Sequence, residues 1–200
     1  PQEQAALDQL LAAWEARTGH RILERYGMSE TMMNTSNPLH GERVAGTVGF
    51  ALPGVSVRIA DADGVVCPTG TTGVIEVRGP NVFAGYWRMP ERTAEEFRAD
   101  GFFITGDLGR MDADGRVTIV GRAKDLIISG GYNVYPKEIE RLLDALPGVV
   151  ESAVIGVPHP DFGEAVVAVV VPGAAPLEEA GVRAGLAGQL ARFKLPKAVV

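Results

Sequence analysis

Cysteine and lysine are both scarce in this chain of 200 residues. The single cysteine, Cys67, excludes an internal disulfide and a zinc site built from cysteines. Such cysteine usage is typical of a reducing compartment, so we expect a cytoplasmic protein. The first lysine is Lys124. The Gly/Thr-rich segment 69–73 therefore lacks the lysine of a phosphate-binding loop, and we interpret it as a turn.

Basic charge, paired histidines and long apolar runs are lacking as well. The chain has 19 basic and 25 acidic residues, a net charge of −6, which argues against a nucleic-acid partner. No apolar stretch reaches the roughly 18 residues that indicate a membrane span. His20, His40 and His159 do not have the spacing of metal ligands. The hydrophobic fraction of 46% is ordinary for a globular protein and excludes a disordered tail.

The N-terminal quarter predicts one helix and then little regular structure. Leucines and a tryptophan recur at helical spacing within residues 1–16, and Gly19 is placed to end this helix. Residues 21–24 are a short strand candidate. Residues 26–54 are rich in Gly, Asn, Ser, Thr and Pro and predict a long irregular loop. The expected apolar face of the helix comprises Leu7, Leu10, Leu11 and Trp14.

Residues 55–120 predict a β-rich region. Strands are expected at 55–59, 74–77 and 116–120, with Asp-Ala-Asp-Gly turns at 61–64 and 112–115. Thr93 and Glu96 have the spacing of a capping box on a short helix that ends near Phe97.

After residue 126 the pattern becomes α+β. Pro136 suits the first position of a capped helix whose apolar stripe packs inward. Strands follow at 149–157 and 165–171, and a second helix is expected over 177–191. The inward residues are Ile139, Leu142, Leu143 and Leu146 on the first helix, and Val182, Leu186 and Leu190 on the second.

Three segments carry side chains suited to chemistry. In 25–31, the Ser29 hydroxyl can bond a phosphate oxygen and the Glu30 carboxylate can hold Mg²⁺; the alternative is a helix N-terminus capped by Ser29. Asp107, placed at the expected end of a strand, can accept both hydroxyls of a ribose, or it can belong to a simple turn. Segment 121–140 combines charged residues with a Gly-Gly turn, and its alternative is an ordinary linker followed by a hairpin.

Taken in order, these segments resemble the adenylate-forming acyl-CoA synthetase superfamily over essentially the whole chain. The resemblance is carried by Tyr-Gly-Met-Ser-Glu at 26–30, the Gly-x-x-Gly-x-Ile-x-Val-x-Gly pattern at 70–79, Gly85-Tyr86, Thr-Gly-Asp at 105–107, and 121–140. Segments 32–38, 86–91 and 133–140 resemble the malonate-activating branch, the malonyl-CoA synthetases.

The resemblance implies a ligase that makes malonyl-CoA, AMP and pyrophosphate from malonate, ATP and CoA through an acyl-adenylate. It implies ATP, Mg²⁺ and coenzyme A as cofactors or substrates, and small molecules rather than a nucleic acid or a membrane as partners. Catalytic roles would fall to Ser29 on the α-phosphate, Glu30 on Mg²⁺ and Lys124 as hinge. The implied binding residues are Tyr26, Gly27, Asp107 and Arg122 for the nucleotide, Ser129, Gly130 and Gly131 for the pantetheine tunnel, and Met28 and Met33 near the acyl pocket.

The resemblance also implies the domain organisation. Residues 1–122 would be the C-terminal part of a large α/β domain with its β-rich subdomain, and 123–200 most of a small, mobile α+β domain that rotates about Lys124. The phosphate loop and the adenylation lysine of the family are not found in the sequence. With a Pro start and an apolar stop, we expect a fragment that acts with the missing N-terminal part of the same protein and is inactive alone. Gly121 beside the hinge supports a mobile joint.

Two alternatives stay open. The chain could belong to a ligase for another acyl or aryl acid, or it could be a non-catalytic module that binds a nucleotide or pantetheine. The presence together of Ser29, Glu30, Asp107 and Arg122 favours an enzyme.

Overall fold

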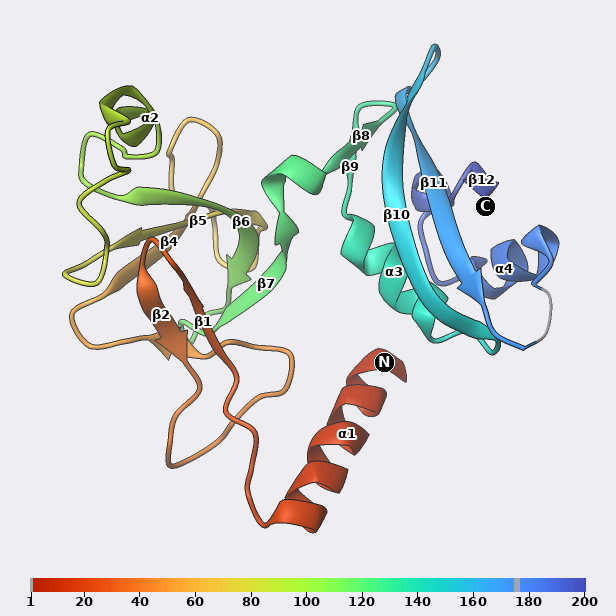
Figure 1. The fold of residues 1–200 in the computed structure, drawn as a ribbon, viewed down its shortest axis with the longest axis horizontal. Helices are drawn as coiled ribbons and strands as arrows, with labels where there is room; N and C mark the ends of the chain where they lie inside the picture. The colour runs from red at the N-terminus through yellow and green to blue at the C-terminus, as the bar shows by residue number, and fades with distance from the viewer. Residues whose placement is uncertain (1, 175–176) are drawn as a thin grey trace. The chain divides into compact units, whose positions relative to one another are not determined.

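The chain divides into two compact units, Pro1–Val120 and Gly121–Val200, of which the computed structural model describes residues 2–174 and 177–200. Figure 1 shows helices and several separate sheets, so the mixed α/β character predicted from the sequence is confirmed. Each unit is described by itself. None of the helices in the described part of the chain combines the length and apolar character that crossing a membrane requires.

The first unit begins with the expected helix, α1 (Gln2–Thr18). Gly19 ends it with a φ of +72°, and its N–H donates to the Glu15 carbonyl at 2.8 Å. Two residues of the expected apolar face are exposed, Leu10 to 62% and Trp14 to 49%. The side chain of Leu7 lies outside the described part of the structure.

A three-stranded antiparallel sheet follows, made of β1 (Arg25–Met28), β2 (Met32–Ser36) and β3 (Phe50–Ala51). Two expectations are wrong here: 21–24 is not a strand, and 26–54 is not an irregular loop throughout but opens with a β-hairpin. The Arg43 guanidinium donates to the carbonyls of Arg21 at 2.7 Å and Ile22 at 3.2 Å. These carbonyls therefore bond a side chain rather than a neighbouring strand.

The β-rich region is a four-stranded sheet in the order β4-β5-β6-β7. Its strands are β4 (Ser56–Ala60), β5 (Gly73–Arg78), β6 (Phe103–Met111) and β7 (Val117–Arg122). One buried core joins this sheet to β1, because Tyr26 packs with residues of β4, β5 and β7. The core residues are Tyr26, Ile59, Ile75, Val77 and Val117.

Both Asp-Ala-Asp-Gly turns form as predicted, with the same geometry. The Asp61 carboxylate accepts the N–H groups of Asp63 at 3.0 Å and Val65 at 2.9 Å. Asp112 accepts those of Asp114 and Arg116 in the same way. Segment 69–73 is also a turn that leads into β5, as predicted.

The short helix α2 (Pro90–Glu95) differs from its prediction. It begins at Pro90, and Thr93 lies inside it rather than at its N-cap. The Thr93 hydroxyl donates to the Met89 carbonyl at 2.8 Å and accepts the Tyr86 N–H at 2.9 Å. The expected capping box is therefore wrong, because the hydroxyl is used across the preceding loop.

The second unit combines helices with one sheet, as the α+β pattern predicted. A short 3₁₀ turn, η1 (Ala123–Asp125), precedes a sheet in the order β10-β11-β8-β9, with β12 parallel to β11. Helix α3 begins at Pro136 without a side-chain cap, and α4 ends at Leu186, five residues short of its predicted end. The other elements are β8 (Ile127–Ser129), β9 (Tyr132–Val134), α3 (Pro136–Asp144), β10 (Val149–His159), β11 (Gly163–Pro172), α4 (Glu179–Leu186), η2 (Arg192–Lys194) and β12 (Ala198–Val199).

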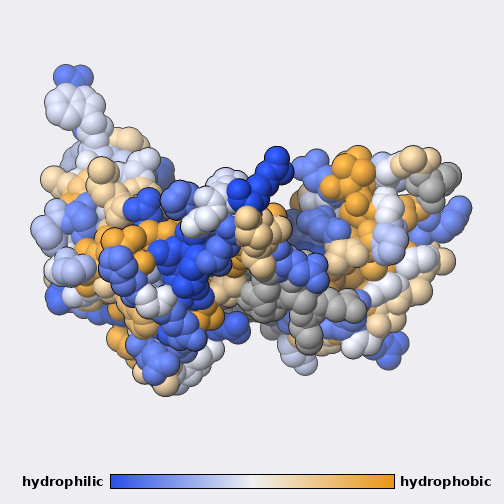
Figure 2. All heavy atoms as spheres, turned by 90° about the horizontal axis from the view of Figure 1, so that it is seen from below, coloured by the Kyte–Doolittle hydropathy of each residue, from blue (hydrophilic) through white to orange (hydrophobic). Residues whose placement is uncertain are grey.

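The helices of this unit bury the predicted residues. Ile139 and Leu143 of α3 and Leu186 of α4 are fully buried, Val182 nearly so, and Leu142, Leu146 and Leu190 pack against their cluster. The opposite face of β10 and β11 stays apolar and exposed, with Ile155 47% and Val169 39% exposed. Figure 2 shows hydrophobic side chains at the surface of both units in the view it gives.

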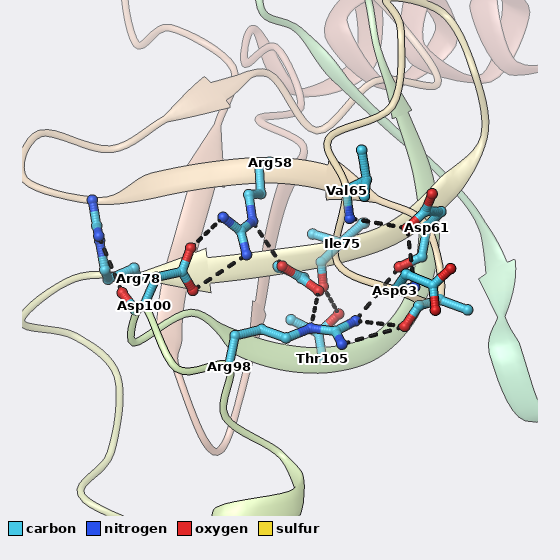
Figure 3. Close-up of polar contacts among 11 residues, drawn as sticks. Arg58, Asp61, Asp63, Val65, Ile75, Arg78, Arg98, Asp100 and Thr105 are labelled. Carbon is cyan, nitrogen blue, oxygen red and sulfur yellow. Dashed lines mark hydrogen bonds and ion pairs between the residues drawn. The ribbon is translucent and has the colours of Figure 1, made fainter.

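A buried carboxylate ties the strands of the first unit together. Glu76 on β5 is inaccessible to solvent and accepts hydrogen bonds from Arg58 at 2.7 Å and Arg98 at 2.8 Å. Arg58 also bonds both oxygens of Asp100, at 2.6 and 3.3 Å (Figure 3). Burial alone would lower the pKa of Arg58, but its hydrogen bonds to these two carboxylates leave it raised. The cluster joins β4, β5 and the loop before β6.

Replacement of this carboxylate should destabilise the protein strongly. Glu76→Ala leaves two arginines without their buried partner, which costs about 3–5 kcal/mol of unfolding free energy. Chemical denaturation measures this loss. Glu95→Ala, at an exposed position of α2, is the matched control and should stay within about 0.5 kcal/mol of the parent protein. Equal effects of the two variants would contradict the assigned role of Glu76.

Hydrogen bonds from Arg58 lower the pKa of Asp100 below its usual value. A carboxyl with a lowered pKa stabilises the folded state above its unfolded pKa, and this contribution disappears as the pH falls through the folded value. Asp100→Asn should therefore shift the denaturation midpoint at about pH 7 and have little effect at about pH 2. A shift of the same size at both pH values would rule out the Arg58–Asp100 pair as its cause.

Candidate functional site

The segment that carries Ser29 and Glu30 is the turn of the β1–β2 hairpin. Only glycine fits at position 27, because an added Cβ would lie 2.0 Å from the Met32 carbonyl oxygen and 2.9 Å from the Met33 sulfur. Met32 itself has a φ of +52°, a conformation that non-glycine residues rarely adopt. Ser29 is exposed and Glu30 half-buried. The hairpin excludes the alternative in which Ser29 caps a helix.

Tyr26 and Asp107 meet although 81 residues separate them in the chain. The Tyr26 hydroxyl donates to Asp107 Oδ2 at 2.5 Å, and the two residues are 6% and 5% exposed. A hydrogen bond to an ionised group is short and about twice as strong as one between neutral groups. This bond brings two motifs that the sequence gives separately, at 26–30 and 105–107, into one site.

Asp107 lies within a strand and not at its end, which corrects the prediction. Val74 pairs with Leu108 and Glu76 with Ile104, so Ile75 alone faces the three residues 105–107. The Thr105 hydroxyl donates to the Ile75 carbonyl at 2.7 Å and accepts the Asp107 N–H at 3.1 Å. Gly106 takes a φ of +73°. A bulge in β6, held to β5 by the Thr105 side chain, therefore determines the position of Asp107.

A third segment of the chain, residues 83–86, donates hydrogen bonds to Glu30. Its backbone carbonyl accepts the Phe83 N–H at 2.8 Å, and its Oε1 accepts the Tyr86 hydroxyl at 3.3 Å. Burial, together with the negative charge of Glu30, raises the pKa of Tyr86, so the hydroxyl keeps its proton and donates.

These residues are compatible with Mg²⁺. No cluster of three or more His, Cys, Asp or Glu suited to a metal occurs in the described part of the chain. Mg²⁺ needs no such cluster, because it keeps several waters and is held by one or two carboxylates together with substrate phosphates. The half-buried carboxylate of Glu30, beside an exposed Ser29, fits that kind of site.

The loop from Phe83 to α2 lines a cavity of about 740 Å³. The predicted acyl-pocket residues lie elsewhere: Met28 and Met33 are partly buried on β1 and β2 and do not line this cavity. The Met28 sulfur is 4.0 Å from the Tyr26 hydroxyl. The cavity is lined by Phe83, Ala84, Gly85, Tyr86, Trp87, Arg88, Met89, Pro90, Thr93, Ala94 and Phe97.

The other predicted residues lie at or beyond the start of the second unit. Arg122 is the exposed last residue of β7, and Lys124 is exposed in η1. Gly130 and Gly131 form the β8–β9 turn with φ values of +59° and +81°. The Ser129 side chain is buried, with 4% exposed.

The structure thus gathers Tyr26, Gly27, Ser29, Glu30 and Asp107 into one site in the first unit. The sequence did not predict that Tyr86 and Thr93 contribute to this site. Gly85-Tyr86 was identified as a motif without a role, and Thr93 was wrongly predicted to cap a helix. Glu76 was also missed, although a charged residue among the apolar positions of β5 signals a buried partner.

Comparisons with known proteins match both units. The family model described as AMP-binding enzyme matches residues 4–87, and the model of the AMP-binding enzyme C-terminal domain matches residues 138–200.

Curated relatives and solved structures agree with these matches. A malonate–CoA ligase of Arabidopsis thaliana is 48% identical over 79% of this chain and 26% of its own length. A sulfoacetate–CoA ligase of Cupriavidus necator is 45% identical over 92% of this chain and 37% of its own length. The crystal structure of ATP-bound MatB from Rhodopseudomonas palustris is 64% identical, with a TM-score of 0.90 over 97% of this chain and 39% of that one. The chain therefore spans about a quarter to two fifths of the length of these proteins.

The close contact between Gly27 and the Met32 carbonyl predicts that one added methyl group at Gly27 destabilises the folded protein. Gly27→Ala forces a Cβ into the Met32 carbonyl and should cost about 1–3 kcal/mol of unfolding free energy. Gly181→Ala is the matched control, because Gly181 lies in α4 and its added Cβ meets nothing within 4 Å. That variant should stabilise the protein by about 0.5–1 kcal/mol. Thermal unfolding of both variants measures the contrast, and an unchanged melting temperature for Gly27→Ala would contradict the hairpin geometry.

Proposed function

The chain belongs to the AMP-binding enzyme family, and from this premise we propose that it is part of an ATP-dependent acid–CoA ligase. The observation that carries the proposal is the 2.5 Å hydrogen bond between Tyr26 and Asp107, because it joins the two motifs expected to hold the nucleotide. The reaction would begin when a carboxylate attacks the α-phosphate of ATP, releasing pyrophosphate. The CoA thiol would then attack the acyl carbon of the acyl-adenylate and release AMP.

In the first half-reaction the hairpin and β6 would act together. Ser29 would donate to the α-phosphate, Asp107 would bind the ribose hydroxyls, and Tyr26, with Gly27, would lie along the adenine. Glu30 would hold Mg²⁺, which when bound offsets the negative charge of the phosphates. The exposure of Ser29 and the partial exposure of Glu30 support this assignment.

In the second half-reaction the small domain would rotate. We assign the large domain to residues 1–122 and the small one to 123–200, with Lys124 as hinge and Arg122 reaching the ribose. The 3₁₀ turn Ala123–Asp125, which lies between two strands and contains no buried residue, supports this assignment. Gly130 and Gly131 are exposed and would line the pantetheine tunnel through their backbone; the buried Ser129 would support their turn.

Malonate is the acid that we propose. The Arabidopsis relative supports it, whereas the sulfoacetate–CoA ligase is nearly as similar. Malonate and sulfoacetate both carry two anionic groups on a very short carbon chain. The substrate class that we propose is a small dianionic acid, and Met28 and Met33 would lie near its pocket. A cytoplasmic location is part of the same proposal and is supported by the single cysteine.

The full-length protein should form AMP in a malonate-dependent reaction that requires CoA and Mg²⁺. Asp107→Asn should weaken ATP binding roughly ten- to a hundredfold, because a hydrogen bond to a charged group contributes about 1.5–3 kcal/mol. Calorimetric titration measures the affinity, and the melting temperature shows whether the variant is folded. The 200-residue chain alone should not exchange pyrophosphate.

A panel of acids separates the alternatives. Preference of the full-length protein for a long-chain or aromatic acid would refute malonate and keep the ligase. Binding of ATP or CoA without AMP formation from any acid would favour a non-catalytic binding module. The gene on either side of this segment gives a second check, because an enzyme of this kind needs a phosphate loop and a catalytic lysine there.

A further inference from the structure

Two hydrogen bonds reach Glu30 from one distant loop. Phe83 donates its N–H to the Glu30 carbonyl at 2.8 Å, and Tyr86 donates its hydroxyl to Oε1 at 3.3 Å. The backbone of the hairpin turn and the carboxylate it carries are therefore held by residues more than fifty positions further along the chain.

Tyr86 is itself held in place by Gly85 and Thr93, and we call these three residues together the clip. The Tyr86 N–H donates to the Thr93 hydroxyl at 2.9 Å, and that hydroxyl donates to the Met89 carbonyl at 2.8 Å. The Thr93 methyl fits against Gly85, where an added Cβ would lie 2.5 Å from it. Gly85 has a φ of +142°, which also requires glycine. The clip gives a role to the Gly85-Tyr86 motif and to Thr93.

The ring of Tyr86 is held from two sides. Phe83 meets it edge to face with centroids 4.8 Å apart, and the Arg92 guanidinium lies 5.2 Å from its centroid. Phe83 in turn packs at 5.3 Å against Phe103, which is 1% exposed. An aromatic ring with such neighbours has little rotational freedom, so its hydroxyl has a defined position.

We propose that Tyr86 is a positioning residue for Glu30, and that the clip fixes the carboxylate in the orientation in which it holds Mg²⁺. The inference rests on the proposed function, because it takes Glu30 as the cation ligand. A carboxylate bonded through one oxygen can offer the other to a cation without reorganising. Carboxylates that bind metals are commonly hydrogen-bonded in this way, and losing the partner typically costs 10–100-fold in metal affinity or activity.

Binding of an ATP analogue by the full-length protein tests the proposal without turnover. The probe is ATP with a methylene group between the α and β phosphorus atoms, titrated once with Mg²⁺ and once with EDTA. The ratio of the two dissociation constants reports the contribution of the cation. Tyr86→Phe should reduce this ratio about tenfold and leave the affinity in EDTA unchanged. Tyr135→Phe is the matched control, because the Tyr135 hydroxyl has no hydrogen-bond partner among residues 2–174 and 177–200, and its ratio should equal that of the parent protein.

Further variants separate this proposal from the proposed function. Glu30→Gln should reduce the ratio at least as much as Tyr86→Phe. If Glu30→Gln reduces it and Tyr86→Phe does not, the positioning role is wrong and the ligase proposal stands. If Mg²⁺ does not improve binding even in the parent protein, or Glu30→Gln has no effect, both the cation site and the positioning role are refuted.

Thr93 offers an independent route to the same answer. Thr93→Ser keeps the hydroxyl and should keep the Mg²⁺ dependence, whereas Thr93→Val removes the clip and should reduce it as Tyr86→Phe does. A purely structural role predicts instead a lower melting temperature and an affinity that falls equally with Mg²⁺ and with EDTA. That pattern in Tyr86→Phe would overturn the proposal.

Discussion

The hydrogen bond between Tyr26 and Asp107 is the contact on which the site in the first unit depends. It is buried, one partner is a carboxylate, and it connects the hairpin sheet to the four-stranded sheet. The hairpin cannot shift without breaking this bond, and the bulge of β6 cannot relax without moving Asp107. The places of Ser29 and Glu30 in the turn follow from where this bond anchors β1. The site is thus a property of two packed sheets rather than of a single loop.

Local signals in the sequence predicted much of the fold. In each of the two Asp-Ala-Asp-Gly turns, one aspartate side chain accepts backbone N–H groups within four residues, so the turn can be predicted from a short stretch of sequence. The buried face of α3 could also be predicted locally, because helical spacing alone places its apolar side chains on one side of the helix. Strands β4, β5, β7, β10 and β11 were predicted within a few residues by their alternation and their branched side chains.

Several predictions failed because a side chain or a strand had a partner outside the local pattern. Residues 21–24 look like a strand, but the Arg43 guanidinium takes their carbonyls. Thr93 has the spacing of a cap, yet its hydroxyl serves Tyr86 and Met89. Motif order identified the candidate site residues, but no local pattern could show that Tyr86 contacts Glu30 or that Asp107 sits within a bulge. Such contacts exist only once separate segments have packed.

The bulge of β6 has a consequence for how this strand can vary during evolution. Ile75 faces three residues, an odd number, so the side chains on either side of the bulge keep the faces they would have in a regular strand. Losing or gaining one residue between Thr105 and Asp107 would turn the rest of β6 over and move Leu108 away from the face on which it is buried. Exchanges of side chains at these positions change local chemistry, whereas a change of length by one would exchange the inside and the outside of the sheet. The length of this segment is therefore constrained by strand parity, whichever side chains it carries.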